Sequence, residues 1–309
     1  MEKKILIAVD GSIHSRKAIE YCIDMCSVIK DMQYILINIH PKISDFLVKE
    51  SQMDAKASSA LESVAEKNKH NSMDILNGYM EIMVKLGVDE NLIEKVSQPV
   101  IQGTAKGILD YAKQKVCDAI VVGDRGKSKL AEAFTGSIAN NILEHTDTTP
   151  VWAVGGDIKT QKVMLAVDGS ESALKAVDHA AFMLAGNTKV KINLIHITPK
   201  LRDYCEIEFD ENGDIIEEVI TSGNKKCVDS FYTHAKKKFT DGGLSETQIE
   251  VMEVESKLSI GKAIVDSARK EGCGTLVVGR RGANDSFFMG SVSRYILTNA
   301  KDCAVWLVP

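Results

Sequence analysis

The sequence lacks any run of 18 apolar residues, so it contains no segment typical of a membrane-spanning helix. Its start, Met1-Glu2-Lys3-Lys4, leads into only five apolar residues, which are too few for the core of a signal peptide. A clustered basic face, which binding to phosphate backbones requires, is also missing, because the net charge is −5 and lysine and arginine are scattered among acidic residues. We therefore predict a cytoplasmic protein that binds neither membranes nor nucleic acids.

The cysteines and histidines do not indicate a metal or redox centre. The seven cysteines are an odd number, and no two of them form a Cys-x-x-Cys pair. Cys22 and Cys26 lie four residues apart on an expected helix, but two sulfurs do not complete a tetrahedral site, so we expect both to pack in the core. His14 follows an Asp-Gly-Ser and is interpreted as solvated rather than as a ligand contact. We predict no metal site.

What the chain does contain is two copies of one sequence pattern. Residues 4–12, Lys-Ile-Leu-Ile-Ala-Val-Asp-Gly-Ser, return at 162–170 as Lys-Val-Met-Leu-Ala-Val-Asp-Gly-Ser. The offset between the copies falls from 158 residues at Asp-Gly-Ser to 156 at a glycine loop and 154 at a later Gly-Ser. Ordered matches with a drifting offset indicate duplication. The small and polar linker at 155–159 places the boundary, giving expected domains 1–156 and 157–309.

Within each copy, short apolar runs alternate with stretches of helical period, which is typical of parallel strands joined by crossover helices. In the first copy we expect strands at 5–9, 34–39, 92–96, 119–122 and 151–154, and helices at 15–29, 51–86, 106–114 and 137–143. In the second copy the helices are expected to follow Ser172, Ser222, Gly261 and Ser291. An inserted segment at 208–216 is either a surface loop or, from its Asn-Gly, a hairpin. The prediction is an α/β protein with two tandem copies of an open, mostly parallel five-stranded sheet flanked by helices.

Three elements follow strand ends, where open parallel sheets bind ligands. Asp10-Gly11-Ser12 offers a carboxylate for a ribose hydroxyl or an adenine amine, and the loop from Gly123 to Gly126 offers backbone N–H groups for phosphate. Gly136-Ser137 opens a helix, whose N-terminus suits an anion. Each element alone is also an ordinary turn or helix cap. Their joint placement in both copies favours a ligand site, although the Walker lysine motif and the Gly-x-Gly-x-x-Gly fingerprint are absent.

Together these residues resemble the universal stress protein family in its tandem form, over nearly the whole chain. The family signature is Gly, two residues, Gly, nine residues, Gly, then Ser or Thr, and the first copy matches it with Gly123, Gly126, Gly136 and Ser137. The final Pro150-Val-Trp-Ala-Val154 also matches. The resemblance implies a Rossmann-like sheet that holds ATP or another adenine nucleotide, with or without Mg²⁺, and that retains ATP or hydrolyses it slowly.

Carried over residue by residue, the resemblance implies one nucleotide site in each copy and no catalytic residue. In the first copy the positions are Val9, Asp10, Gly11, Ser12, Ile39, Gly123, Asp124, Arg125, Gly126, Gly136, Ser137 and Ile138. In the second copy they are Val167, Asp168, Gly169, Ser170, Ile197, Gly279, Arg280, Arg281, Gly282, Gly290, Ser291, Val292 and Ser293.

Both copies depart from the family pattern. The first has Ala139 where a second hydroxyl is common, whereas the second has that hydroxyl as Ser293. The second copy has only seven residues between Gly282 and Gly290, and Ser259 stands where the first copy has Gly103. We therefore expect two unequal sites, with the first copy the better binder of a triphosphate.

Three functions remain open from the sequence. The first is a nucleotide-binding stress or regulatory module with little chemistry. The second is a slow ATP hydrolase or phosphotransferase, for which Asp10, Asp124, Asp168 and Asp285 are the candidate carboxylates. The third is a ligand-free interaction protein whose terminal strands, carrying Trp152 and Trp306, pair edge to edge within one chain or in a homodimer. Each tryptophan is alternatively a plain core residue.

Overall fold

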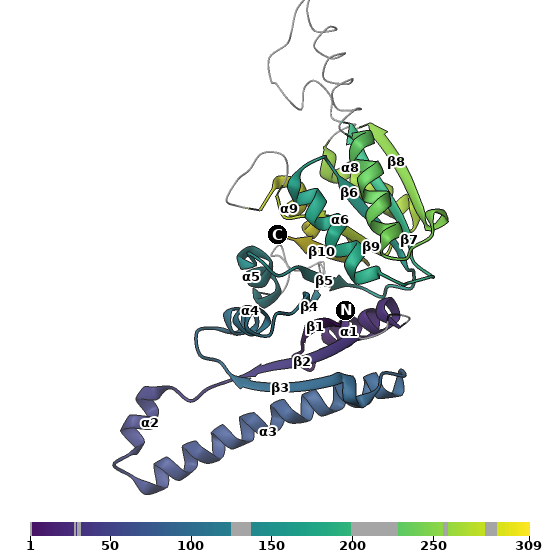
Figure 1. Cartoon of the computed structure of the whole chain (residues 1–309). Coiled ribbons are helices and arrows are strands. Elements are labelled where there is room, and N and C mark those ends of the chain that lie inside the picture. The colour runs from purple at the N-terminus through teal and green to yellow at the C-terminus, as the bar shows by residue number, and fades with distance from the viewer. Residues whose placement is uncertain are drawn as a thin grey trace, which may run out of the picture. The chain divides into compact units, whose positions relative to one another are not determined.

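The structure is a computed structural model that describes residues 2–27, 29, 32–124, 137–198, 228–255, 259–281 and 289–309. The chain forms two compact units (Figure 1). The first comprises Met1–Ser27 and Asp31–Thr149, and the second comprises Val28–Lys30 and Pro150–Pro309. Each unit has its own buried apolar core.

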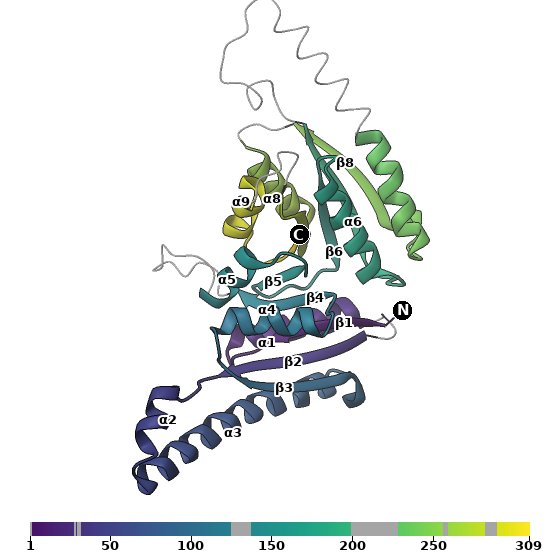
Figure 2. The same ribbon diagram turned by 60° about the vertical axis from the view of Figure 1, so that its left-hand side comes forward.

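The first unit contains parallel strands in the order β3-β2-β1-β4. Its strands are β1 (Lys3–Ala8), β2 (Met32–His40), β3 (Ile93–Pro99) and β4 (Ala119–Asp124). Its helices are α1 (Ile13–Cys26), α2 (Asp45–Ser51), α3 (Ala55–Lys85), α4 (Thr104–Gln114) and α5 (Ser137–His145), with a short 3₁₀ helix at Glu90–Leu92. Helix α3 packs on β2 and β3, and α4 packs on α5 (Figures 1 and 2). The apolar runs of β1 and β2 form the centre of this core, because both faces of these strands are covered.

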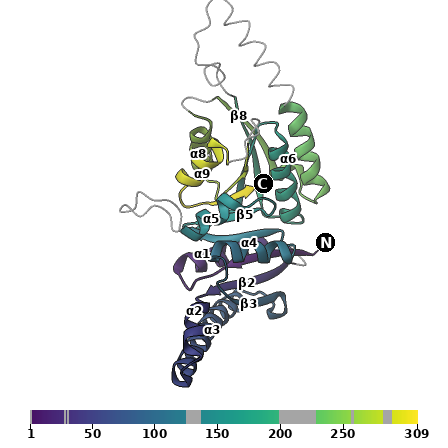
Figure 3. The ribbon, with the colours of Figure 1, turned by 90° about the vertical axis from the view of Figure 1, so that its left-hand side faces the viewer.

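The second unit contains strands in the order β5-β10-β9-β6-β7-β8, and every pair is parallel except β5–β10. These strands are β5 (Val151–Gly155), β6 (Lys162–Val167), β7 (Lys191–Thr198), β8 (Ile249–Glu255), β9 (Thr275–Gly279) and β10 (Ala304–Val308). The helices are α6 (Glu171–Leu184), residues 228–241, α8 (Ile260–Glu271) and α9 (Ser291–Asn299), with a 3₁₀ helix at Glu246–Gln248. Helix α8 lies beside α9 (Figure 3).

The predicted fold class is confirmed, since each copy of the repeat contributes five strands to a mostly parallel α/β arrangement. The strand expected at 92–96 is present as β3. The strand that ends the first copy, β5, lies in the second compact unit, where it pairs with β10. The compact units therefore divide the chain a few residues before the sequence repeat does.

Several helix boundaries differ from the predicted ones because the capping residues lie elsewhere. The helix expected over 51–86 is interrupted: α2 ends at Ser51, and α3 begins after Asp54, whose carboxylate accepts hydrogen bonds from the N–H groups of Lys56 and Ala57. Helices α1 and α6 begin directly after Ser12 and Ser170, which cap them. The inserted segment at 208–216 lies outside the described residues.

Two tryptophans join the antiparallel strands of the second unit. Trp152 and Trp306 are partners in the β5–β10 register, and their rings stack with centroids 3.9 Å apart and an interplanar angle of 1°. Both side chains are fully buried. The indole N–H of Trp152 donates a hydrogen bond to Nε2 of His179, on α6, at 3.0 Å. The tryptophans are thus core residues and cross-strand partners at once.

Burial lowers the pKa of His179 to about 3, so this imidazole stays neutral in the folded protein at neutral pH. Because its Nε2 accepts a hydrogen bond from Trp152, the ring carries its own proton on Nδ1. A proton added to Nε2 would break this hydrogen bond and place a charge in the core.

We expect the free energy of unfolding of the second unit to decrease as the pH is lowered below about 6.5, the pKa of an exposed histidine. In that range the unfolded chain takes up a proton on His179 and the folded chain does not, so the loss is on the order of 1 kcal/mol per pH unit down to about pH 3. Urea unfolding at a series of pH values between 7 and 4 measures this loss. Fluorescence reports it directly, because the chain's two tryptophans both lie beside His179. In His179→Gln, which retains an acceptor but does not titrate, the slope should be shallower. Equal slopes in both proteins would contradict this account.

Candidate functional site

A cavity of about 160 Å³ lies at the carboxyl ends of β1, β2 and β4 in the first unit. It is the place where an open parallel sheet binds ligands. Six of the expected site residues line it: Val9, Asp10, Ser12, Ile39, Gly123 and Ile138. The structure therefore brings together residues that lie as much as 129 positions apart in the chain, counted from Val9 to Ile138.

Asp10 is held by the first turn of α1. Its Oδ1 accepts hydrogen bonds from the N–H of Ser12 at 3.1 Å and from the hydroxyl of Ser15 at 2.7 Å. The hydroxyl of Ser15 also accepts from the N–H of Asp10 at 3.1 Å. Tyr79, on α3, donates from its hydroxyl to the Ser12 carbonyl at 2.7 Å. The carboxylate is thereby fixed in orientation at the rim of the cavity.

Glycine is required at the turn between β1 and α1 and at the end of β4, for different reasons. Gly11 has φ +80, a left-handed conformation that other residues rarely adopt. At Gly123 a Cβ would lie 2.5 Å from the His14 carbonyl carbon and 2.9 Å from the Ser15 nitrogen. The second copy repeats this contact, because a Cβ on Gly279 would lie 2.9 Å from the carbonyl carbon of Ser172. Packing against the helix start thus requires these two glycines whether or not a ligand is bound.

The floor of the first cavity comes from β2. Ile39 faces α4, where a Cβ on Gly107 would meet its Cδ1 at 3.5 Å. The buried Asn38 donates from Nδ2 to the Val9 carbonyl at 2.6 Å and so ties the end of β1 to β2. Sequence reasoning missed Asn38, Ser15 and Thr104, all of which line the cavity. His14, interpreted from the sequence as solvated, also lines it. A polar residue inside the apolar run of β2 was the available signal for Asn38.

The matching turn of the second copy is built with fewer hydrogen bonds. Oδ1 of Asp168 accepts from the N–H of Ser170 at 3.0 Å, but Ala173 stands in the place of Ser15 and offers no hydroxyl. Gly169 has φ +76, as the turn requires. Nδ1–H of His196, which corresponds to Asn38, donates to the Val167 carbonyl at 2.9 Å. Ile197 is buried on the same strand.

Helix α9 begins where the anion side of the second copy was expected. It begins at Ser291 after Gly290, which makes no side-chain cap, so backbone N–H groups at this end are not capped by a side chain. Gly290 N–H donates to the Arg280 carbonyl at 2.9 Å, which ties the two ends of the loop together. Arg281 N–H donates to Oγ of Ser172 at 3.4 Å. Val292 follows in the first turn of α9.

The hydroxyl of Ser293 is directed toward the sheet. It is buried and donates to the Gly279 carbonyl at 2.7 Å. In the first copy the equivalent Ala139 is buried too and simply lacks this bond. The difference between the copies at this position is therefore one hydrogen bond to the backbone in this structure.

Gly103 and Ser259 differ in backbone conformation as well as in side chain. Gly103 precedes α4 with φ +104, whereas Ser259 precedes α8 in an extended conformation with φ −156. The serine hydroxyl then caps α8 by accepting from the N–H of Lys262 at 3.2 Å. The serine is accommodated because the backbone has rotated out of the left-handed region.

Part of each expected phosphate loop lies outside the described residues. These positions are Arg125, Gly126, Gly136 and Gly282, together with the side chain of Ser137. Asp124 is described and ends β4. Within the described part of the chain, no helix is long and apolar enough to cross a membrane. Among the same residues, no group of three or more His, Cys, Asp or Glu side chains could hold a metal ion.

Comparison with known proteins identifies both halves of the chain with one family. The sequence model of the Universal stress protein family matches residues 1–155 and again residues 159–309. The universal stress protein YxiE of Bacillus subtilis is 29% identical over 157 residues, which cover 50% of this chain and 99% of that protein.

Solved structures show the same fold. A universal stress protein from Archaeoglobus fulgidus matches with 18% identity and a TM-score of 0.60, covering 99% of this chain and 97% of that chain. A universal stress protein solved in complex with cAMP is 22% identical, with a TM-score of 0.34, and covers 48% of this chain and 97% of that one. That second likeness extends over about half of this chain.

We expect Gly123→Ala to destabilise the first unit by about 2 kcal/mol, because the added methyl group overlaps the backbone of α1. Gly107→Ala is the matched control: its Cβ would make ordinary contacts at 3.5 Å inside α4, so stability should stay the same or rise by up to ~1 kcal/mol. Thermal and urea unfolding of the full chain compares the two variants. If Gly123→Ala were as stable as the parent, the close approach of β4 to α1 would not be a real constraint.

Proposed function

The chain belongs to the universal stress protein family, of which it carries two copies in tandem, and on this premise we propose that it binds adenine nucleotides as a stress-response or regulatory module with little or no turnover. The observation that carries the proposal is the cavity of the first copy, where Asp10, Ser12, Ile39 and Gly123 converge at the strand ends. We assign one domain of this family to residues 1–156 and the other to residues 157–309.

The lining divides into an apolar part and a polar part, as the two ends of a nucleoside require. Val9, Ile39 and Ile108 offer apolar surface for an adenine ring. Asp10, whose orientation is set by Ser12 and Ser15, offers a carboxylate for a ribose hydroxyl. The cavity, of about 160 Å³, is open to solvent on one side and is too small to enclose a whole triphosphate. The phosphates would extend toward the start of α5, since helix N-termini attract anions.

We assign Asp10 to binding rather than to catalysis. A phosphoryl-transfer enzyme needs a carboxylate that holds a metal ion and a group that orients water. Oδ1 of Asp10 already accepts two hydrogen bonds from its own turn, which supports a fixed acceptor of a sugar hydroxyl. Retention of the nucleotide without rapid turnover follows from this assignment.

The first copy is proposed as the tighter site. Ser15 orients Asp10 there, whereas the second copy has Ala173 at this position. The hydroxyl of Ser293, expected near the phosphates, donates to Gly279 instead. ATP, ADP or AMP, with or without Mg²⁺, are the ligands to compare.

The terminal strands supply a proposed partner interaction. Because β5 ends the first copy and pairs with β10 of the second, we propose that this antiparallel pair ties the two copies into an internal dimer. The buried Trp152–Trp306 stack supports a permanent rather than a transient pairing. The chain composition supports action in the cytoplasm, free of nucleic acid and membrane. A further homodimer of the whole chain is compatible with this arrangement.

We expect Asp10→Ala to weaken ATP binding about fivefold, the effect of losing a hydrogen bond worth about 1 kcal/mol. Asp168→Ala is its counterpart in the second copy and should reduce the affinity of the tighter site by less than twofold. Isothermal titration of the full chain with ATP and with ADP gives both affinities, and phosphate release with Mg²⁺ present gives the turnover. Absence of heat at millimolar nucleotide would refute nucleotide binding, and rapid phosphate release would refute the lack of turnover.

A further inference from the structure

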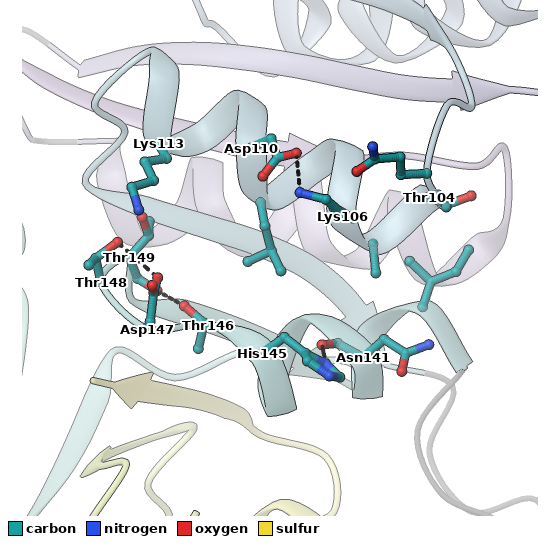
Figure 4. A pocket seen from close by; sticks show the side chains of 15 residues that line it. Thr104, Lys106, Asp110, Lys113, Asn141, His145, Thr146, Asp147, Thr148 and Thr149 are labelled. Carbon is teal, nitrogen blue, oxygen red and sulfur yellow. Dashed lines mark hydrogen bonds and ion pairs between the residues drawn. The ribbon is translucent and has the colours of Figure 1, made fainter. Parts of the chain in front are cut away.

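A second and larger cavity, of about 560 Å³, lies between α4 and α5 of the first unit (Figure 4). Thr104 and Ile138 line both this cavity and the smaller one, so the two are neighbours. The lining of the α4–α5 cavity is polar and apolar in equal parts and extends along α4 to the segment 146–149. Its volume falls in the range of small-molecule sites.

We propose that the α4–α5 cavity binds a small neutral polyhydroxylated molecule, of the size of a monosaccharide. The proposal goes beyond nucleotide binding and does not depend on it, because the cavity has its own lining along α4 and the end of α5. Two observations carry it: the contrast with the second copy, and the alternation of donors and acceptors around the cavity.

In the second copy the same place is filled by an aromatic ring. The repeat aligns Asn141 with Tyr295 and Ala105 with Gly261. A Cβ on Gly261 would lie 2.9 Å from the Cβ of Tyr295 and 3.0 Å from its Cγ, so the tyrosine packs directly on the glycine. The first copy has a short amide instead of the ring, and the space between its helices is open.

The helices themselves match in the two copies at this point. Nδ1–H of His145 donates to the Asn141 carbonyl at 2.8 Å, and in the second copy Nδ2 of Asn299 donates to the Tyr295 carbonyl at the same distance. The cavity therefore does not arise from a frayed helix. The exchange of Tyr295 for Asn141 removes a ring that packs on the neighbouring helix in the second copy.

The lining alternates between hydrogen-bond donors and acceptors. On α4, Lys106 forms an ion pair with Asp110 at 2.8 Å, and Lys113 extends toward the segment 146–149 (Figure 4). Across the cavity lie the carboxylate of Asp147, which accepts from the Thr148 hydroxyl at 3.2 Å, and the ring of His145. Because Nδ1 of His145 carries its proton, the neutral ring presents Nε2 as an acceptor.

This alternation decides the class of ligand. A simple anion would meet the carboxylates of Asp110 and Asp147, and a simple cation would meet Lys106 and Lys113. Vicinal hydroxyl groups both donate and accept, so they can satisfy lysines and carboxylates together. Leu109 and Ile138 provide apolar surface for the C–H face of a sugar ring.

The test is ligand-observed saturation-transfer NMR on the full chain, with D-glucose, D-ribose, glucose 6-phosphate and inorganic phosphate as probes. We expect at least one neutral sugar to bind with a dissociation constant on the order of 1 mM. The double variant A105G/N141Y reproduces the pair of residues found in the folded second copy, and it should weaken sugar binding at least tenfold. Asn140→Tyr adds the same ring to the neighbouring position of α5, outside the cavity lining, and should leave sugar binding unchanged.

The experiment separates this proposal from nucleotide binding, since A105G/N141Y should retain the ATP affinity of the parent chain within about twofold. Circular dichroism of the variant confirms its fold. Binding of only the phosphorylated sugar and inorganic phosphate would overturn the proposal in favour of an anion site. Absence of transfer to any probe at tens of millimolar, or full sugar binding by A105G/N141Y, would overturn it as well.

Discussion

The close approach of a strand end to the first turn of a helix is the constraint on which the rest of the site depends. Gly123 brings β4 against the backbone of His14 and Ser15, and Gly279 does the same against Ser172. Once that contact is made, Ser15 is in place to hold Asp10, and the ends of β1 and β4 border one cavity. A glycine that looks like part of a phosphate loop is thus first a packing residue. Binding, where it occurs, uses a geometry that packing has already imposed.

Much of this architecture could be predicted from the sequence because it depends on patterns that repeat. Continuous apolar runs marked the buried strands, and Asp-Gly-Ser marked both the strand end and the helix cap, so the fold and the location of the first cavity followed. Helix boundaries set by local capping were harder to predict. The helical pattern of residues 51–86 is continuous, so it did not indicate that a helix begins after Asp54. The roles of Ser15 and Asn38 were missed because both residues lie outside the Val-Asp-Gly-Ser motif, although Ser15 bonds to Asp10 and Asn38 to Val9 within it. The α4–α5 cavity was not predicted, because the exchange of Gly261 for Ala105 and of Tyr295 for Asn141 becomes informative only once the structure shows Tyr295 packed on Gly261.

The two copies have kept the order of their strands and helices and changed several polar side chains. Ser15 corresponds to Ala173, and Asn38 corresponds to His196. Gly103 corresponds to Ser259, where the backbone is rotated. Asn38 and His196 still make the same bond to the end of the first strand of their copy, so the structural role survived the change of residue. Duplication has therefore provided one scaffold with two chemically different surfaces at equivalent places.

The position of β5 bears on how such a chain can change over time. This strand ends the first copy but covers the edge of β10, and with it the face of Trp306. A shortened descendant that retained only the second copy would present a bare strand edge and a large apolar ring, which invite aggregation. Such a descendant would first have to acquire another strand to cover that edge. Fusion of the two copies is therefore easily gained by duplication, but deletion of the first copy would expose an apolar strand edge and so is not easily reversed.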